Sequence, residues 1–208
     1  MYSDVTGIIL AGGKSTRMGA NKSLLKIGNI TLVEHVLQLM QSIFEKVVII
    51  TNTPDEFRFL NVALYKDIYE YYGPLAGIHS GLHYSVTNQN FIISVDMPLM
   101  TEQMIKYIVD FPTPLPITVC RADGFVQQLA GRYSKDVISI AENALSENED
   151  EIRHNRQSKR KCKVLSLLDE AGAEILDAQK LDFYEDGLFY NMNRPDDYKF
   201  ILDRIEIN

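Results

Sequence analysis

The chain alternates short apolar runs with segments of helical periodicity, and this alternation restricts its fold more than any other feature. The apolar runs at 5–10, 46–51, 62–66 and 91–95 each have the length of a strand that is buried on both faces. Helix-like segments separate them. We therefore predict an α/β fold: a three-layer αβα sandwich around a mostly parallel, Rossmann-like sheet.

Signals for helix starts lie between these runs. Thr31 and Glu34 have the spacing of a capping box, which predicts a helix from residue 31 to about residue 44. Similar signals predict helices that begin near Thr53, Gly73 and Thr101. After residue 115 the pattern is weaker. It predicts a strand pair at 117–121 and 125–133 that turns at Asp123–Gly124, an exposed helix or loop at 147–160, and helices from Lys163 and Pro195.

Length and composition fit a soluble globular protein, and we expect residues 1–208 to form a single domain. Hydrophobic residues make up 46% of the chain and charged residues 24%, which excludes bulk disorder and fibrous folds. No apolar run approaches the roughly 18 residues of a membrane span, and no secretory leader is visible. The cysteines, Cys120 and Cys162, are too few for a disulfide scaffold. We therefore expect a cytoplasmic protein with no membrane contact.

The net charge of −7 conceals an uneven distribution. Six of the 21 basic residues lie in the stretch 153–163, so the remainder of the chain carries 15 basic against 28 acidic residues. Because nucleic-acid binding needs an extended basic face, this balance argues against a nucleic-acid partner. The local basic stretch suits a small anionic ligand, or is simply a solvated polar segment.

The first apolar run ends in Gly12 and Gly13, and two cations follow, Arg17 and Lys22. Glycines let the backbone approach a bulky ligand and expose its N–H groups, and the cations match a polyphosphate. A Walker A loop would need a glycine where Ile8 stands. No G-x-G-x-x-G motif is present either. The loop therefore indicates a nucleotide site of a different type.

Polar residues also follow three other predicted strands. Asp96 ends the run 91–95, where a carboxylate can face a ligand and hold Mg²⁺ together with phosphate oxygens. Its structural alternative is a helix cap, although Thr101 already stands at the expected helix start. Asn52 and Asp67 follow two further runs, where a carboxylate can accept two hydrogen bonds from one edge of a ligand. Their alternative is ordinary turn chemistry.

The stretch Leu10-Ala-Gly-Gly-x-Ser-x-Arg-Met-Gly-x-x-Lys22 resembles the signature of nucleotidyltransferases that share the nucleotide-diphosphosugar transferase fold. Three more stretches narrow the resemblance to the molybdenum cofactor guanylyltransferases and occur in that family's order. They are Gly73-Pro-Leu-Ala-Gly-Ile78, Val95-Asp-Met-Pro98 and Asn191-Met-Asn193-Arg-Pro-Asp-Asp197.

The resemblance assigns roles to residues at the matching positions. It implies a GTP site at Leu10, Ala11, Gly12, Gly13, Lys22, Asn52, Asp67 and Asp96, a molybdopterin site at Asn191 and Asn193, and a catalytic set of Arg17, Lys22 and Asp96. Asp96 would hold the Mg²⁺ cofactor, Lys22 would reach the phosphates, and Arg17 would bind the β- and γ-phosphates. The asparagines have a structural alternative as a turn that caps a terminal helix.

The implied reaction is attack by the terminal phosphate of molybdopterin on the α-phosphorus of GTP, with pyrophosphate as the leaving group. No serine or cysteine is paired with a histidine in the loops that follow the predicted strands, so catalysis would rest on positioning and charge neutralisation. The resemblance also implies transient contacts with proteins that deliver and receive the cofactor. The four histidines form no metal-like cluster, and we expect His35 and His83 to be packing or surface residues.

Two alternatives stay open from the sequence. A molybdopterin cytidylyltransferase or a sugar-1-phosphate nucleotidyltransferase would use the same loop and metal. A non-catalytic carrier would bind the nucleotide or cofactor and pass it on. Retention of Arg17, Lys22 and Asp96 together favours an enzyme.

Overall fold

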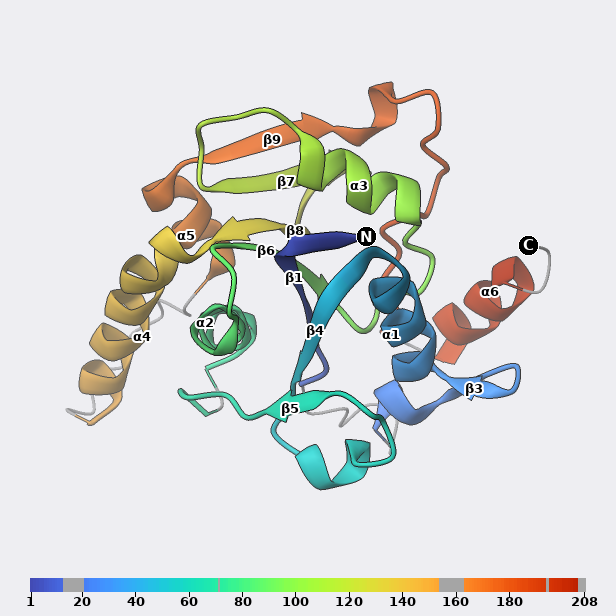
Figure 1. Cartoon of the computed structure of the whole chain (residues 1–208), viewed down its shortest axis with the longest axis horizontal. Coiled ribbons are helices and arrows are strands. Elements are labelled where there is room, and N and C mark those ends of the chain that lie inside the picture. Colours follow the sequence, from blue (N-terminus) through green and yellow to red (C-terminus); the bar gives the residue numbers. More distant parts are fainter. Residues whose placement is uncertain (13–20, 71, 154–162, 194, 206–208) are drawn as a thin grey trace.

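A mixed β-sheet forms the centre of the computed structural model, which describes residues 1–12, 21–70, 72–153, 163–193 and 195–205 (Figure 1). Seven strands of the described residues build it, in the spatial order β5-β4-β1-β6-β8-β7-β9. Their bounds are β1 (Tyr2–Leu10), β4 (Phe44–Ile50), β5 (Ala63–Tyr65), β6 (Gln89–Ser94), β7 (Ile117–Ala122), β8 (Phe125–Ser134) and β9 (Ala173–Asp177). The predictions made for Gly13, Arg17, His154, Cys162 and nearly all of the basic stretch lie outside the described residues.

The sheet has a parallel half and a half with mixed strand directions. In the first, β5, β4, β1 and β6 all run parallel. In the second, β8 is antiparallel to both β6 and β7, and β9 pairs with β7 in parallel. The predicted αβα sandwich with a mostly parallel sheet is therefore confirmed.

Helices cover both faces of the sheet, as Figure 1 shows. Along β1, Ile9 packs into a core with α1, α3 and α6, whereas its neighbour Ile8 packs into a second core with α2, α4 and α5. The alternation follows from the twofold periodicity of strand side chains. The helices are α1 (Leu32–Ile43), α2 (Pro74–Tyr84), α3 (Glu102–Asp110), α4 (Ile138–Arg153), α5 (Val164–Ala171) and α6 (Pro195–Ile205).

The predicted start and turn signals are present in the structure. Thr31 and Glu34 form the full capping box at the start of α1. Thr101 caps α3 by accepting a hydrogen bond from the backbone N–H of Met104. The strand pair β7–β8 turns at Asp123, with φ +53°, and Gly124, with φ +80°. These elements confirm that local sequence determines where the chain changes direction.

Several short elements carry no clear sequence signal. The small hairpin of β2 (Lys26–Ile27) and β3 (Ile30–Thr31) lies between the first loop and α1, and 3₁₀ turns occupy η1 (Lys22–Leu24), η3 (Lys135–Val137) and η4 (Ala178–Lys180). The helix predicted to begin near Thr53 is a fourth 3₁₀ turn, η2 (Pro54–Phe57), with the proline in its first turn. Among the helices of the described ranges, none combines the length and apolar character that crossing a bilayer requires.

Candidate functional site

The register of the parallel strands brings four predicted site residues to one edge of the sheet. In the pairings of β5, β4, β1 and β6, four residues share one row: Tyr65, Ile50, Leu10 and Ser94. Two positions beyond this row, in the segments that directly follow the four strands, stand Asp67, Asn52, Gly12 and Asp96. Neighbouring strands lie about 4.8 Å apart, so the four positions extend over roughly 14 Å, which is the length scale of a nucleoside triphosphate.

The backbone of β1 remains part of the sheet up to residue 11. The Ala11 N–H donates to the Ile50 carbonyl at 2.9 Å, and the Leu10 carbonyl accepts from the Val95 N–H at 3.0 Å. Leu10 and Ala11 are both buried. The Ala11 N–H and the Leu10 carbonyl therefore already have partners within the sheet, so these two groups offer a ligand shape and close approach rather than hydrogen bonds.

At one end of this edge, Asn52 and Asp67 form a hydrogen-bonded pair. The Asn52 Nδ2 donates to the Asp67 Oδ2 at 2.8 Å. The other oxygen of each side chain, Asn52 Oδ1 and Asp67 Oδ1, is buried without a partner. Burial raises the pKa of the Asp67 carboxyl, and the nearby Glu70 adds to the rise while the bond from Asn52 opposes it. The pair therefore carries two buried acceptors without a partner, which is a costly arrangement unless a donor reaches them.

Helix α2 closes against this pair. A Cβ added at Gly77 would stand 3.3 Å from the Leu10 side chain and 3.7 Å from Asp67 Oδ1. Ser80 accepts a hydrogen bond from the Ile68 N–H at 2.8 Å, which holds the loop after β5 against the helix. The sequence prediction did not include Gly77 as a site residue, although the Gly73–Ile78 motif contained it.

At the other end of the edge, Lys22 and Asp96 form an ion pair. The Lys22 Nζ lies 2.6 Å from the Asp96 Oδ2, and the two side chains are 20% and 13% exposed. Asp96 Oδ1 is buried and has no partner. Asn21 caps the η1 turn that carries Lys22, because its Oδ1 accepts from the Ser23 N–H. The structure thus joins two of the three residues of the predicted catalytic set; the third, Arg17, lies outside the described residues.

The segment that contains Asn191 and Asn193 packs onto this ion pair through the residue between them. The Met192 N–H donates to the Asp96 carbonyl at 2.9 Å, and its carbonyl accepts from the Lys22 Nζ at 3.4 Å. Met192 is buried. The backbone contacts of Met192 could not be predicted from its side chain. Its place between the two motif asparagines was the one sequence feature that pointed to this segment.

The two asparagines also have local partners. The Asn191 side chain donates to the Phe189 carbonyl, and the backbone N–H of Asn193 donates to Asp197 Oδ2 at 2.7 Å. Asp197 lies in the first turn of α6. Asn191 and Asn193 therefore form part of a turn before the terminal helix, as their structural alternative predicted. The backbone bond of Met192 also places them beside Asp96.

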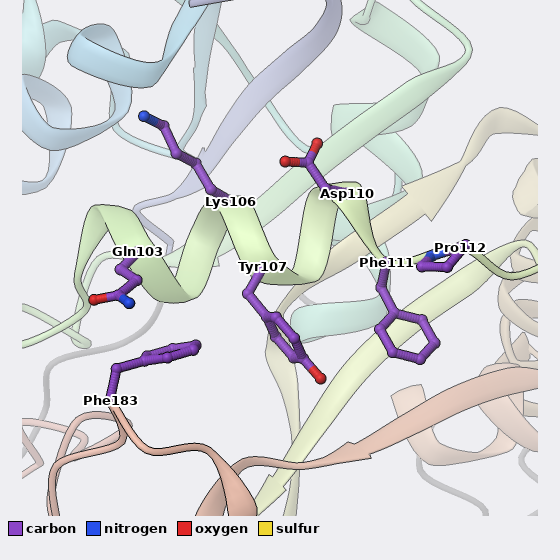
Figure 2. Close-up of a pocket in the computed structure, with 7 residues that line it drawn as sticks. All are labelled: Gln103, Lys106, Tyr107, Asp110, Phe111, Pro112 and Phe183. Carbon is purple, nitrogen blue, oxygen red and sulfur yellow. The ribbon is translucent and has the colours of Figure 1, made fainter.

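A separate groove of about 350 Å³ lies on α3, away from these residues. Figure 2 shows three aromatic side chains, Tyr107, Phe111 and Phe183, with Gln103 beside Phe183. Predicted site residues are absent from its lining as far as the described residues show. Its aromatic lining offers few groups that would bind a polyphosphate, so the polar edge of the parallel strands is the candidate site.

Comparison with known proteins gives the family. A family model described as the MobA-like NTP transferase domain matches residues 7–161. The chain belongs to this family. A probable molybdenum cofactor guanylyltransferase of Carboxydothermus hydrogenoformans is 29% identical over 201 residues, which cover 96% of this chain and 95% of that protein. The resemblance read from the sequence motifs is confirmed, and the chain is a nucleotidyltransferase of the MobA-like family.

Solved structures agree with the fold. The crystal structure of the molybdopterin-guanine dinucleotide biosynthesis protein A of Archaeoglobus fulgidus superposes with a TM-score of 0.81 at 19% identity, over 98% of this chain and 100% of that one. A Mycobacterium tuberculosis protein that was solved as a complex with manganese has a TM-score of 0.67 at 17% identity, over 98% of this chain and 100% of that one. Metal dependence is typical of nucleotidyltransferases, and this structural relative was solved with a divalent metal.

Proposed function

We propose that this MobA-like protein transfers GMP from GTP to the terminal phosphate of molybdopterin and releases pyrophosphate. The observation that carries the proposal is the cluster of Lys22, Asp96 and Met192. It places a cation, an unpartnered carboxylate oxygen and the Asn191–Asn193 segment together at one end of the strand edge. A donor nucleotide and a phosphorylated acceptor would meet there.

The pair at the opposite end supports guanine as the base. Asn52 turns its N–H₂ toward Asp67, since two facing oxygens would repel, and this leaves Asn52 Oδ1 and Asp67 Oδ1 as two acceptors without a partner on one hydrogen-bonded pair. Guanine presents two neighbouring donor groups, N1–H and N2–H₂, that match them. The corresponding edges of adenine and cytosine each present a ring acceptor beside the amino group, which would face an oxygen. Guanine therefore satisfies both buried acceptors at once.

The residues at Asp96 fit a divalent metal that arrives with its nucleotide. Mg²⁺ takes one or two carboxylates together with substrate phosphate oxygens, and Asp96 Oδ1 is an available carboxylate oxygen. No group of three or more acidic, histidine or cysteine side chains forms a metal site among the described residues. Asp96 would thus hold Mg²⁺ jointly with GTP. When bound, the metal would supply neutralisation of charge on the phosphate oxygens.

Lys22 changes partner in this proposal. In the structure its ammonium group pairs with Asp96. When the nucleotide binds, the flexible side chain of Lys22 would move this group to the phosphates. Arg17 is proposed to bind the leaving β- and γ-phosphates. The acceptor phosphate is already anionic, so the chain need not supply a general base. Lys22, Arg17 and Asp96 would contribute by placing the reacting groups and by balancing their charge.

The acceptor would bind next to Asn191 and Asn193. Met192 N–H holds this segment to the Asp96 carbonyl, so an acceptor that the asparagines orient would lie beside the α-phosphate. We further propose that residues 1–208 act as one domain in the cytoplasm and make transient contacts with the proteins that deliver and receive the pterin.

The test is a transfer assay with purified chain, molybdopterin, Mg²⁺ and each of GTP, CTP, ATP and UTP. We expect pyrophosphate release and a guanine dinucleotide product with GTP. Preference for CTP would instead make the protein a cytidylyltransferase. Binding without pyrophosphate release for every acceptor tested would make it a carrier.

A further inference from the structure

The segment that follows Asp96 is a tight turn that continues directly from this residue. The Met97 N–H donates to the Ser94 carbonyl at 3.2 Å, and the Met100 N–H donates to the Met97 carbonyl at 3.4 Å. Pro98 lies between them and is buried. Because proline has no N–H, its carbonyl is the one backbone group through which this residue can be held by a hydrogen bond.

His35 of α1 supplies that hydrogen bond. Its Nε2 lies 2.9 Å from the Pro98 carbonyl oxygen, across 63 residues of sequence. A carbonyl only accepts, so Nε2 carries the proton in this contact. Among the side chains of the described residues, His35 alone has a hydrogen bond to the turn 97–100. This contact differs from the surface or packing role expected from the sequence.

The helix that carries His35 is itself fixed in place. Leu32 and Val36 on the neighbouring turns are fully buried, and the Thr31–Glu34 capping box closes the first turn. The Leu32 N–H also donates to the Leu25 carbonyl at 2.8 Å, which ties the start of α1 to the segment just after Lys22. Helix α1 is therefore a rigid support, so His35 can hold the turn at a defined distance from it.

Two contacts thus link the segment 22–35 to the segment 96–98. One is the ion pair of Lys22 with Asp96, and the other is the hydrogen bond of His35 with the Pro98 carbonyl. In the proposed function Lys22 leaves Asp96 for the phosphates. The His35 contact involves no atom of the metal, the nucleotide or Lys22, so it can persist through that exchange.

We propose that His35 is a positioning residue, which keeps the Asp96 carboxylate aligned for the divalent metal by holding the Pro98 carbonyl after Lys22 has moved away. This inference rests on the proposed function, because it takes Asp96 as the metal-holding residue. Residues that orient a metal ligand without touching the metal typically affect metal affinity as well as the reaction rate. A merely structural role would change stability alone.

The experiment measures binding of the Mn²⁺–GTP complex to the chain, without acceptor, by the increase in the water-proton relaxation rate when Mn²⁺–GTP becomes protein-bound. His35→Leu removes the donor, His35→Gln keeps an N–H group of similar reach, and His83→Leu is the matched control. His83 is an exposed histidine of α2 whose described contacts are to aromatic rings. Urea unfolding of each variant records stability separately.

We expect His35→Leu to weaken Mn²⁺ binding by about three- to tenfold, the usual range for one hydrogen bond. His35→Gln should restore most of the affinity, and His83→Leu should leave it unchanged. Amide hydrogen exchange should quicken at Met100 in His35→Leu and return to normal in His35→Gln.

Two results would overturn the role of His35: a His35→Leu variant that binds Mn²⁺ as His83→Leu does, or a stably folded His35→Gln variant no better than His35→Leu. If the wild-type chain bound no Mn²⁺ with GTP, the assignment of Asp96 would fail and the role of His35 with it. If the wild-type chain binds Mn²⁺ and transfers GMP, and the His35→Leu variant binds Mn²⁺ equally well, only the positioning role of His35 is refuted.

Discussion

In the parallel half of the sheet, four neighbouring strands end at one edge, whereas in the mixed half β8 runs against its neighbours β6 and β7. The halves also differ in how they use buried polar groups. At the parallel edge, Asn52, Asp67 and Asp96 each leave one buried oxygen without a partner. In the mixed half, Arg132 uses its two terminal nitrogens on the Val109 and Phe111 carbonyls and on a threonine, with only Nε left over.

The contrast separates two purposes of buried polarity. Arg132 holds the end of α3 onto β8, which is a structural task that is complete within the protein. The three oxygens at the parallel edge have no partner within the described protein, and in the proposed function they gain one from the ligand. Gln128 Oε1 of β8 is also buried without a partner, but it does not lie at the carboxyl ends of the parallel strands. Unpartnered polar groups therefore indicate binding when several of them gather at those strand ends.

Asp96→Asn should give the largest effect. It removes the charge that would hold the metal, so transfer should fall by more than about 10³-fold in a pyrophosphate-release assay. Metal binding with GTP should fall in parallel. Glu102→Gln is the control, because Glu102 is a carboxylate of α3 that pairs with Lys106 on the surface. Equal losses in both variants would show that the contrast between the two regions does not hold.

Lys22→Gln should lower the transfer rate by about 10²- to 10³-fold, as for the loss of one preorganised donor. The same change should strengthen Mn²⁺ binding to the nucleotide-free protein, because no ammonium group then competes for Asp96 Oδ2. Lys106→Gln, on the surface of α3, should alter neither quantity. Weaker metal binding without nucleotide in Lys22→Gln would contradict the exchange of partners proposed for Lys22.

Asp67→Asn should mainly change base selectivity. An amide in place of the carboxylate lets Asn52 and residue 67 pair differently, so the double acceptor for guanine is lost. We expect kcat/KM for GTP to fall by about 10- to 100-fold, the range for one bidentate base contact, with little change for CTP. Competition between GTP and CTP measures the ratio directly. An unchanged ratio would remove Asp67 from base recognition.

Tyr107→Ala in the α3 groove should have the smallest effect on activity. Tyr107 contacts Phe111 and Phe183 edge to face, so its loss should lower stability by roughly 1 kcal/mol or more. The KM for GTP and the transfer rate should stay at wild-type values, with urea unfolding as the stability measurement. A large loss of activity in a folded variant would give the groove a part in the reaction.

Much of the parallel half could be predicted from sequence, because its information is local. Each apolar run encodes one strand, and each cap residue encodes one helix start, as at Thr31 and Thr101. The strand ends then placed Asn52, Asp67 and Asp96 at one edge through a general property of parallel sheets. The short edge strand β9 was missed because its five residues form no unbroken apolar run.

The pairings within the site could not be predicted, because they join residues far apart in the chain. Lys22 meets Asp96 across 74 residues, and His35 meets Pro98 across 63. Met192 contributes only backbone atoms, so its side chain carries no sign of the role. Residue type shows what a group can do, whereas the register of the sheet decides which other group it meets.

The equal offset of the candidate site residues from the strand row has a consequence for how such an enzyme can diversify. Asn52 and Asp67 follow β4 and β5 and bond to each other, whereas Asp96 follows β6, on the other side of β1. A substitution in the Asn52–Asp67 pair should therefore leave the Lys22–Asp96 pair intact. In the proposed function, the choice of base could then change at one side of the sheet while the phosphate chemistry at the other side is inherited.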